Sequence, residues 1–307
     1  LCADAFFGAV APLLADVDAS LPRCPLDAQL CQGGQDSAVI EKCAWDALLI
    51  VRRKLEQDPA VTRYIAERLV EAREGLGRLG RLRRHDAPRV EAVYETAREM
   101  LETPPEDLMS RPGANATLRG ELGAVLAHCN RRSGGAVLTA AADLRGSTSV
   151  NLIGEAFPQG FFNTEGNPAA RTLSLGGICE DGATGILTGI STFGRHVGVV
   201  ASYGAFLAPL THITARLHAI GSQARRAVSG DPFNPMIAIC AHAGLTTGED
   251  GPTHADPQAL QLLQENFPKG TVVTLTPWEP REIWTLMAAA LAQRPAVIAP
   301  FVTRPSE

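Results

Sequence analysis

The stretch MIAIC at residues 236–240 is an uninterrupted apolar run, and a polar loop that begins at His242 follows it almost directly. Other short apolar runs have the same character and alternate with helix-length segments: GAVLTA at 135–140, VGVVA at 197–201, TVVTL at 271–275 and AVIA at 296–299. Strands that are apolar on both faces and alternate with helices are typical of a parallel sheet that is covered on both sides. We therefore predict a doubly wound, mostly parallel α/β fold with helices on both faces of the sheet.

Helical spacing of apolar residues predicts the connecting elements. Within the α/β region we expect helices over 117–131, after the glycine pair at 176–177, over 209–222 and over 279–292. The first third of the chain has the same spacing over 36–55, 57–75 and 87–102, and prolines then interrupt it between 103 and 116. The predicted organisation is a helical segment or linker at 1–112 and an α/β domain at 113–307.

The composition excludes several function classes. The 307 residues are 45% hydrophobic and 20% charged with a net charge of −5, which is typical of a globular chain and lacks the basic excess of nucleic-acid-binding proteins. No apolar run approaches the roughly 20 residues of a membrane helix. The seven cysteines form no C-x-x-C pair, and their odd number favours the reduced cytoplasm over a disulfide-bonded secreted protein. We expect a cytoplasmic protein that binds neither nucleic acid nor membrane.

Polar and glycine-rich segments follow the predicted strands. In a doubly wound fold, ligands bind beyond the carboxyl ends of the strands, so these segments are the candidate site. Three of these segments are DLRGSTS at 143–149, SYGAF at 202–206 and HAGLTTGEDGPTH at 242–254. A fourth lies at the start of the second helix and includes Glu180.

The last of these segments resembles a known family. The run TGEDGPTH at 247–254 is similar to the G-E-D-G-P-T-H loop that follows a strand in the pyrimidine-binding domain of transketolases. Other family motifs occur in the same order: ADL at 142–144 with Ser147 resembles A-D-L-x-x-S, Glu180 stands at the glutamate of G-V-R-E, YGAFL at 203–207 resembles G-G-T-F-L, and Thr303-Arg304 resembles S-R. The resemblance covers about 115–304.

The resemblance implies a transferase that uses thiamine diphosphate with Mg²⁺ to move a two-carbon ketol unit between sugar phosphates. It implies that Glu180 hydrogen-bonds ring nitrogen N1′ of the aminopyrimidine, that Phe206 stacks on this ring, and that Asp143 and Leu144 lie at the cofactor. The alternatives are that Glu180 caps a helix, as acidic residues do at helix starts, and that Phe206 packs in the core.

The same resemblance implies a substrate site. It assigns catalytic and sugar-binding roles to His242 and His254, which lie twelve residues apart, and sugar contacts to Asp250 between them. Arg119, Ser147 and Arg304 match acceptor-phosphate contacts of the family, and the bidentate guanidinium fork suits that task. The remaining histidines, His85, His128, His196 and His218, are interpreted as structural.

The sequence departs from the family pattern at several positions. Cys179 and Asp181 flank the glutamate, and Pro209 and His212 stand where the family continues its aromatic residues. The G-D-G motif that anchors the diphosphate through Mg²⁺ is absent from the sequence, so we expect no metal ligands in this chain. The chain ends just after the last strand, where transketolases continue into a third domain. We therefore expect the diphosphate-binding half to come from another chain or from missing polymer, with residues 1–112 possible as its tail.

The resemblance and the departures from it leave three interpretations. The first is the pyrimidine-binding half of a transketolase-like enzyme that assembles as a homodimer or heterotetramer. The second is another thiamine-diphosphate enzyme, such as deoxyxylulose-phosphate synthase or a 2-oxoacid dehydrogenase subunit. The third is a non-catalytic homologue that serves as a dimerisation or scaffold domain, with its cofactor site eroded at Cys179, Pro209 and His212.

Overall fold

The structure is a computed structural model, and it describes residues 4–15, 19–23, 37–80, 84–109, 113–141, 145–206, 213–214, 218–243, 260, 263, 267–303 and 305–306. Contacts along the chain divide it into two compact units, Leu1–Arg83 and Arg84–Glu307. Each unit has buried apolar residues of its own.

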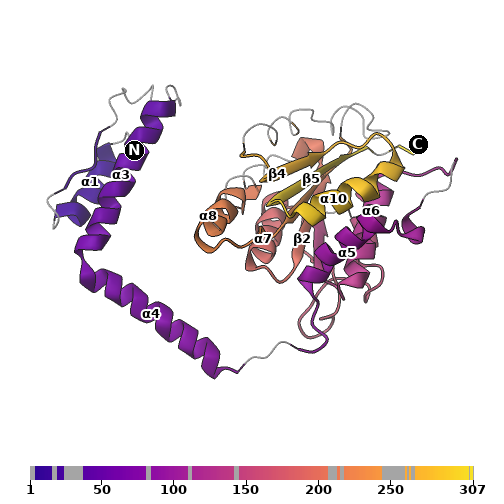
Figure 1. The fold of residues 1–307 in the computed structure, drawn as a ribbon, viewed down its shortest axis with the longest axis horizontal. Helices are drawn as coiled ribbons and strands as arrows, with labels where there is room; N and C mark the ends of the chain where they lie inside the picture. The colour runs from indigo at the N-terminus through magenta and orange to yellow at the C-terminus, as the bar shows by residue number, and fades with distance from the viewer. Residues whose placement is uncertain are drawn as a thin grey trace. The chain divides into compact units, whose positions relative to one another are not determined.

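The first unit is helical (Figure 1), with α1 at Asp4–Leu14, α3 at Ser37–Gln57 and α4 at Pro59–Arg78. Leu14 of α1 and Ala47 of α3 belong to one small cluster of buried apolar residues. Asp58 caps the start of α4, because its side chain accepts a hydrogen bond from the Val61 amide at 3.1 Å; α4 contains no buried residue. The helices that the sequence predicts over 36–55 and 57–75 are confirmed, whereas α1 was not predicted.

The second unit is built on a five-stranded parallel sheet in the order β1-β2-β3-β5-β4 (Figure 1). All residues of β2, β3 and β5 are buried, while β1 and β4 form the edges and are partly exposed. The strands are β1 at Val137–Ala141, β2 at Val197–Tyr203, β3 at Met236–Ala241, β4 at Val272–Leu275 and β5 at Val297–Val302. The predicted parallel α/β sheet is therefore confirmed.

Helices cover both faces of the sheet. Because side chains alternate along a strand, Val199 points into the cluster formed with α5, α6 and α10, and Val200 points into the cluster formed with α7. These helices are α5 at Val90–Glu102, α6 at Leu118–Arg132, α7 at Glu180–Phe193 and α10 at Ile283–Gln293; short 3₁₀ turns occupy Glu106–Leu108, Val150–Gly154, Gly204–Phe206 and Pro280–Glu282. The layers are those of a doubly wound fold.

The helix that precedes β3 differs from its prediction over 209–222. In the part of this segment that the structure describes, residues 213–214 and 218–219 are in π-helical turns, and α8 runs from Ile220 to Ser229. None of the α8 residues is buried, and the helix ends at Gly230, whose backbone is left-handed with a φ of 71°.

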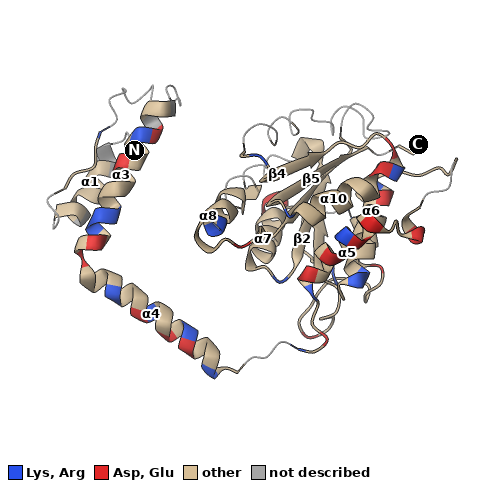
Figure 2. Cartoon of the chain, viewed as in Figure 1, with Lys and Arg blue, Asp and Glu red and all other residues tan. Residues whose placement is uncertain are grey.

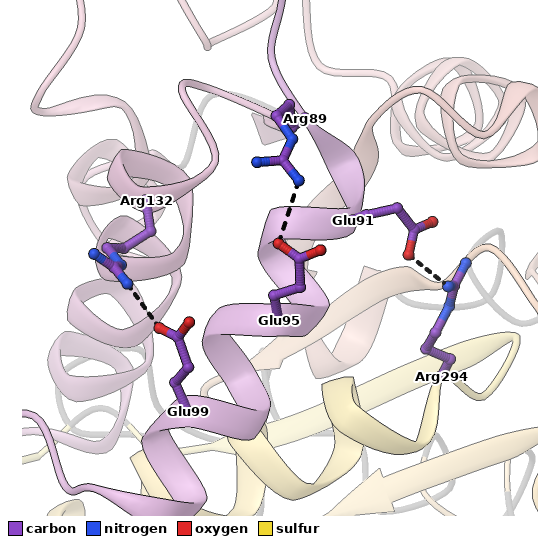
Figure 3. Close-up of polar contacts among 6 residues, drawn as sticks. All are labelled: Arg89, Glu91, Glu95, Glu99, Arg132 and Arg294. Carbon is purple, nitrogen blue, oxygen red and sulfur yellow. Dashed lines mark hydrogen bonds and ion pairs between the residues drawn. The ribbon is translucent and has the colours of Figure 1, made fainter.

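The α5 helix belongs to the second unit. Figure 3 shows Glu99 of α5 paired with Arg132 of α6, and Glu91 of α5 paired with Arg294 beyond α10, at 2.7 and 2.9 Å. The guanidinium of Arg294 also lies 4.1 Å from the ring centre of Tyr94, a buried α5 residue. The domain boundary between residues 112 and 113 stays a prediction.

Close packing positions α7 on the sheet. A Cβ atom at Gly198 of β2 would lie 2.2 Å from the carbonyl oxygen of Leu187 in α7, so only glycine permits this approach. The Gly198 amide also donates a hydrogen bond to Ser191 Oγ of α7 at 2.8 Å. These contacts fix the helix whose first residue is Glu180.

Charged residues lie on the helices and in the loops, outside the strands. Figure 2 shows Lys, Arg, Asp and Glu along α3, α4, α5 and α6, whereas the strands carry none. None of the helices in the described part of the chain combines the length and the apolar composition that crossing a bilayer requires.

Candidate active site

The candidate site lies where β1, β2 and β3 end. Ser147 follows β1 in a turn, Tyr203 is the last residue of β2, and His242 directly follows β3. Tyr203 pairs in register with Ala241, so the ends of β2 and β3 are neighbours in the sheet. Residues that are far apart in sequence therefore meet at one sheet edge, as expected for a doubly wound fold.

Arg119, Ser147 and His242 form a polar cluster. Arg119 is in the first turn of α6. Thr117 caps this helix, and its hydroxyl accepts a hydrogen bond from the Gly120 amide at 3.0 Å. Arg119 Nη1 donates to the Ser147 carbonyl oxygen and lies 3.4 Å from His242 Nε2. His242 Nε2 lies 3.3 Å from the same carbonyl oxygen. Because a carbonyl oxygen has two lone pairs, it can accept from both side chains.

The His242 side chain is fully buried, and its backbone is left-handed with a φ of 56°. Its imidazole stacks on the Tyr203 ring with 4.0 Å between ring centres and an angle of 18° between planes. The Tyr203 hydroxyl donates to Ser147 Oγ at 2.7 Å. The tyrosine thus contacts two of the three members of the cluster.

Glu180 is the first residue of α7, and its side chain is turned toward the sheet. The cap position belongs to Cys179, whose sulfur accepts a hydrogen bond from the Gly182 amide at 3.3 Å. The Glu180 carboxylate instead accepts from the hydroxyl of Ser202, a fully buried β2 residue, at 3.3 Å. Capping of α7 therefore does not account for the glutamate at this position.

Phe206 lies in the 3₁₀ turn after β2 and is 41% exposed, so it is not a buried core residue. Its ring centre lies 6.4 Å from that of Tyr203.

A pocket of about 720 Å³ opens beyond the end of β1, and the segment that leads to Cys179 forms one wall of it. The guanidinium of Arg145, in this pocket, lies 4.7 Å from the ring centre of Phe161. The full lining is Ala141, Arg145, Gly146, Asn151, Phe161, Leu173, Ser174, Leu175, Gly176, Gly177 and Ile178.

Half of the predicted site residues are described. The structure brings Arg119, Ser147 and His242 together and places Glu180 and Phe206 at the same sheet edge. The other predicted residues lie outside the described residues: Asp143, Leu144, Asp250, His254 and Arg304. Within the described ranges, no group of three or more His, Cys, Asp or Glu side chains is arranged to hold a metal ion.

Residue-by-residue reasoning missed two side chains of the site. Ser202 donates to Glu180, and Tyr203 contacts both Ser147 and His242. Both are polar residues at the end of an otherwise apolar strand, which was the available signal for them.

A comparison with models of protein families identifies the family of this chain. The family model described as the transketolase pyrimidine-binding domain matches residues 116–303, more than half of the chain. This chain belongs to that family. Transketolase 2 of Saccharomyces cerevisiae is 34% identical to it over 99 residues, which make up 32% of this chain and 13% of the yeast protein.

Solved structures agree with the fold of this transketolase pyrimidine-binding domain. A transketolase from Leishmania mexicana has a TM-score of 0.51 at 17% identity, and the match covers 85% of this chain and 34% of that one. A transketolase variant from Pichia stipitis has a TM-score of 0.51 at 15% identity, covering 88% of this chain and 35% of that one. The chain thus spans about a third of the length of these transketolases.

Proposed function

We propose that residues 113–307 form the pyrimidine-binding half of a cytoplasmic, thiamine-diphosphate-dependent enzyme that transfers a two-carbon ketol unit between sugar phosphates. The observation that carries the proposal is the Glu180 carboxylate, which leaves the capping of α7 to Cys179 and bonds to the buried Ser202. A carboxylate held at a sheet edge by a buried hydroxyl is positioned for a ligand rather than for the helix.

The described residues fit the pyrimidine half of the cofactor. Glu180 would hold a proton at ring nitrogen N1′, and the exposed ring of Phe206 would offer a stacking surface to a planar heterocycle. We also assign Asp143 and Leu144 to this site. When bound, thiamine diphosphate supplies the nucleophilic carbon that carries the ketol unit.

The cluster after β1 and β3 fits a sugar phosphate. The Arg119 guanidinium carries five N–H donors, one of which bonds to the Ser147 carbonyl oxygen, and His242 Nε2 lies 3.3 Å from that oxygen. Phosphate oxygens accept bonds from such donors. We assign the phosphate of the acceptor to Arg119, Ser147 and Arg304, and the sugar to Asp250 and His254, with His242 shared between the two tasks.

We assign the Mg²⁺ ion and the diphosphate to another chain or to further polymer, in a homodimer or heterotetramer. The outward face of α7 supports such an assembly, because Ile186 is 49% exposed and Phe193 is 79% exposed on the helix that begins with Glu180. The two residues are seven positions apart and so lie on one face of α7, and apolar side chains that share an exposed face suit an interaction surface.

Replacement of the carboxylate tests the catalytic assignment. In the chain assembled with its diphosphate-binding partner, we expect Glu180→Gln to lower the rate of ketol transfer from a ketose phosphate to an aldose phosphate by roughly 10²- to 10⁴-fold, the range for loss of a proton-transfer group. The matched control is Asp181→Asn, which changes the next, exposed carboxylate of α7 and should leave the rate within about twofold.

The result that would overturn the assignment is an unchanged rate in the Glu180→Gln enzyme. The partner itself is sought by mass spectrometry of material that co-purifies with the chain. A chain that co-purifies with nothing and transfers no ketol unit would support the scaffold interpretation instead.

A further inference from the structure

Tyr203 connects the residues that we assign to the phosphate. It is 5% exposed at the end of β2, its hydroxyl donates to Ser147 Oγ at 2.7 Å, and its ring stacks on His242 at 4.0 Å. The family motif that this segment resembles, G-G-T-F-L, contains no tyrosine.

The hydrogen-bond direction at Ser147 has a chemical consequence. A hydroxyl that accepts from Tyr203 uses a lone pair for that bond, so its own proton is directed away from the tyrosine. Phosphate oxygens need donors, and a serine whose proton is directed in this way is oriented as a donor.

Tyr203 also fixes the plane of the imidazole. His242 Nε2 lies 3.3 Å from the Ser147 carbonyl oxygen, which can only accept, and 3.4 Å from Arg119 Nη1, which can only donate, so the two contacts suit opposite tautomers of the ring. The ring stack, with 18° between the planes, resists rotation of His242 away from both groups.

We propose that Tyr203 is a positioning residue that orients Ser147 as a hydrogen-bond donor for a phosphate group and holds His242 in place beside it, without itself touching the phosphate. This inference rests on the proposed function, because it takes the phosphate site from there. The shared ligand chemistry is a phosphate group, which either a sugar phosphate or free inorganic phosphate presents.

The direct test is titration of the full 307-residue chain with inorganic phosphate by isothermal calorimetry. Tyr203→Phe keeps the ring and removes the donor, and we expect it to weaken phosphate binding roughly fivefold, the scale of one hydrogen bond. The matched control is Tyr94→Phe, which changes the other buried tyrosine, in the core beside α10, and should leave the affinity unchanged.

A double-mutant cycle separates positioning from simple packing. Because Tyr203 acts through Ser147 Oγ, adding Tyr203→Phe to Ser147→Ala should weaken phosphate binding by no more than about 1.5-fold further, a difference within the error of additivity. Equal fivefold losses in both backgrounds would overturn the proposal, and so would a Tyr203→Phe chain that binds phosphate as well as the native chain.

Substrate kinetics in the assembled enzyme distinguish the two sources of phosphate. If the ligand is a sugar phosphate, Tyr203→Phe should raise KM for a phosphorylated acceptor about fivefold and change kcat less. An unphosphorylated acceptor should show a smaller change in KM. If Tyr203→Phe weakens phosphate binding but the enzyme transfers no ketol unit, the proposed function is refuted and this inference stands. If the enzyme transfers ketol units but Tyr203→Phe changes neither phosphate binding nor KM, this inference is refuted and the proposed function stands.

Discussion

His242 turns the chain after β3 in a backbone conformation that L residues adopt at a cost. Its φ of 56° lies in the left-handed region, where glycine is the usual residue. The stack on Tyr203 and the contact with the Ser147 carbonyl hold the side chain in place. Left-handed residues persist where surrounding contacts over-determine them, and such places are often binding or catalytic sites.

This conformation predicts an unusual order of stability among substitutions at His242. Both His242→Ala and His242→Gly remove the imidazole, but only glycine relieves the left-handed strain. We therefore expect the Gly variant to be more stable than the Ala variant by about 1 kcal/mol. Urea denaturation followed by circular dichroism measures the difference.

An ordinary helical position supplies the control for that comparison. Ile186 is half-exposed on α7, and there alanine should be more stable than glycine by about 1 kcal/mol. Equal stabilities of the Ala and Gly variants at position 242 would contradict a left-handed backbone in the folded protein.

At the scale of elements, the contact between β2 and α7 sets the position of Glu180. We expect Gly198→Ala to destabilise the chain by roughly 1–3 kcal/mol, because the new methyl group would overlap the carbonyl of Leu187 and push α7 away from the sheet. The same shift would lengthen the 3.3 Å bond between Ser202 and Glu180. Thermal and urea denaturation measure the loss of stability.

Gly189 in the same helix is the matched control. A Cβ atom there would have no neighbour within 4 Å, so Gly189→Ala should stabilise α7 by about 0.5–1 kcal/mol through helix propensity. If Gly198→Ala left the stability unchanged, the close approach of α7 to β2 would be refuted.

The strands could be predicted from sequence because each is a near-continuous apolar run. The observed bounds of β3, Met236–Ala241, differ from the predicted run at 236–240 by one residue. The end of α8 was not predicted, although Ile220, Ala224 and Val228 keep helical spacing and Gly230, with a φ of 71°, ends the helix. Helical spacing does not require burial, because α4 has no buried residue and was predicted from the same pattern.

The location of the candidate site could be predicted from the sequence, but most of its side-chain contacts could not. The loops after the strands of a doubly wound sheet identify the edge that carries Ser147 and His242. The bond between Tyr203 and Ser147 joins residues 56 positions apart, and it depends on the placement of the turn at 145–149 beside the end of β2. No local pattern encodes that geometry.

At the scale of the whole molecule, the buried His218 and the half-buried His196 link the stability of the folded chain to pH. His218 is 1% exposed, and its Nε2 lies 2.9 Å from the Ala296 carbonyl oxygen and 3.1 Å from that of Asn234. Burial lowers the pKa of His218 below its ordinary value, although both carbonyls favour its protonated form. Burial also lowers the pKa of His196, with a further contribution from the positive charge of Arg171.

Both shifts favour the neutral imidazole in the folded state, so the unfolded chain binds protons first as pH falls. Burial of the neutral imidazoles therefore stabilises the folded chain fully at pH values above the ordinary histidine pKa of about 6.5. This stabilisation is lost as pH falls from there through the lower pKa of the folded state. The free energy of unfolding should therefore decrease between about pH 7.5 and 5.5, with His218 contributing at most about 1.4 kcal/mol per pH unit.

Substitution of His218 isolates its share of this slope. We expect His218→Gln to lower stability at pH 7.5, because it disturbs the two carbonyl contacts, and to flatten the decline toward pH 5.5, because glutamine binds no proton. His85 is exposed and provides the control, since His85→Gln should leave the stability at pH 7.5 and its decline toward pH 5.5 unchanged. Urea denaturation at several pH values measures the slope, and an equally steep decline in the His218→Gln chain would show that other groups cause it.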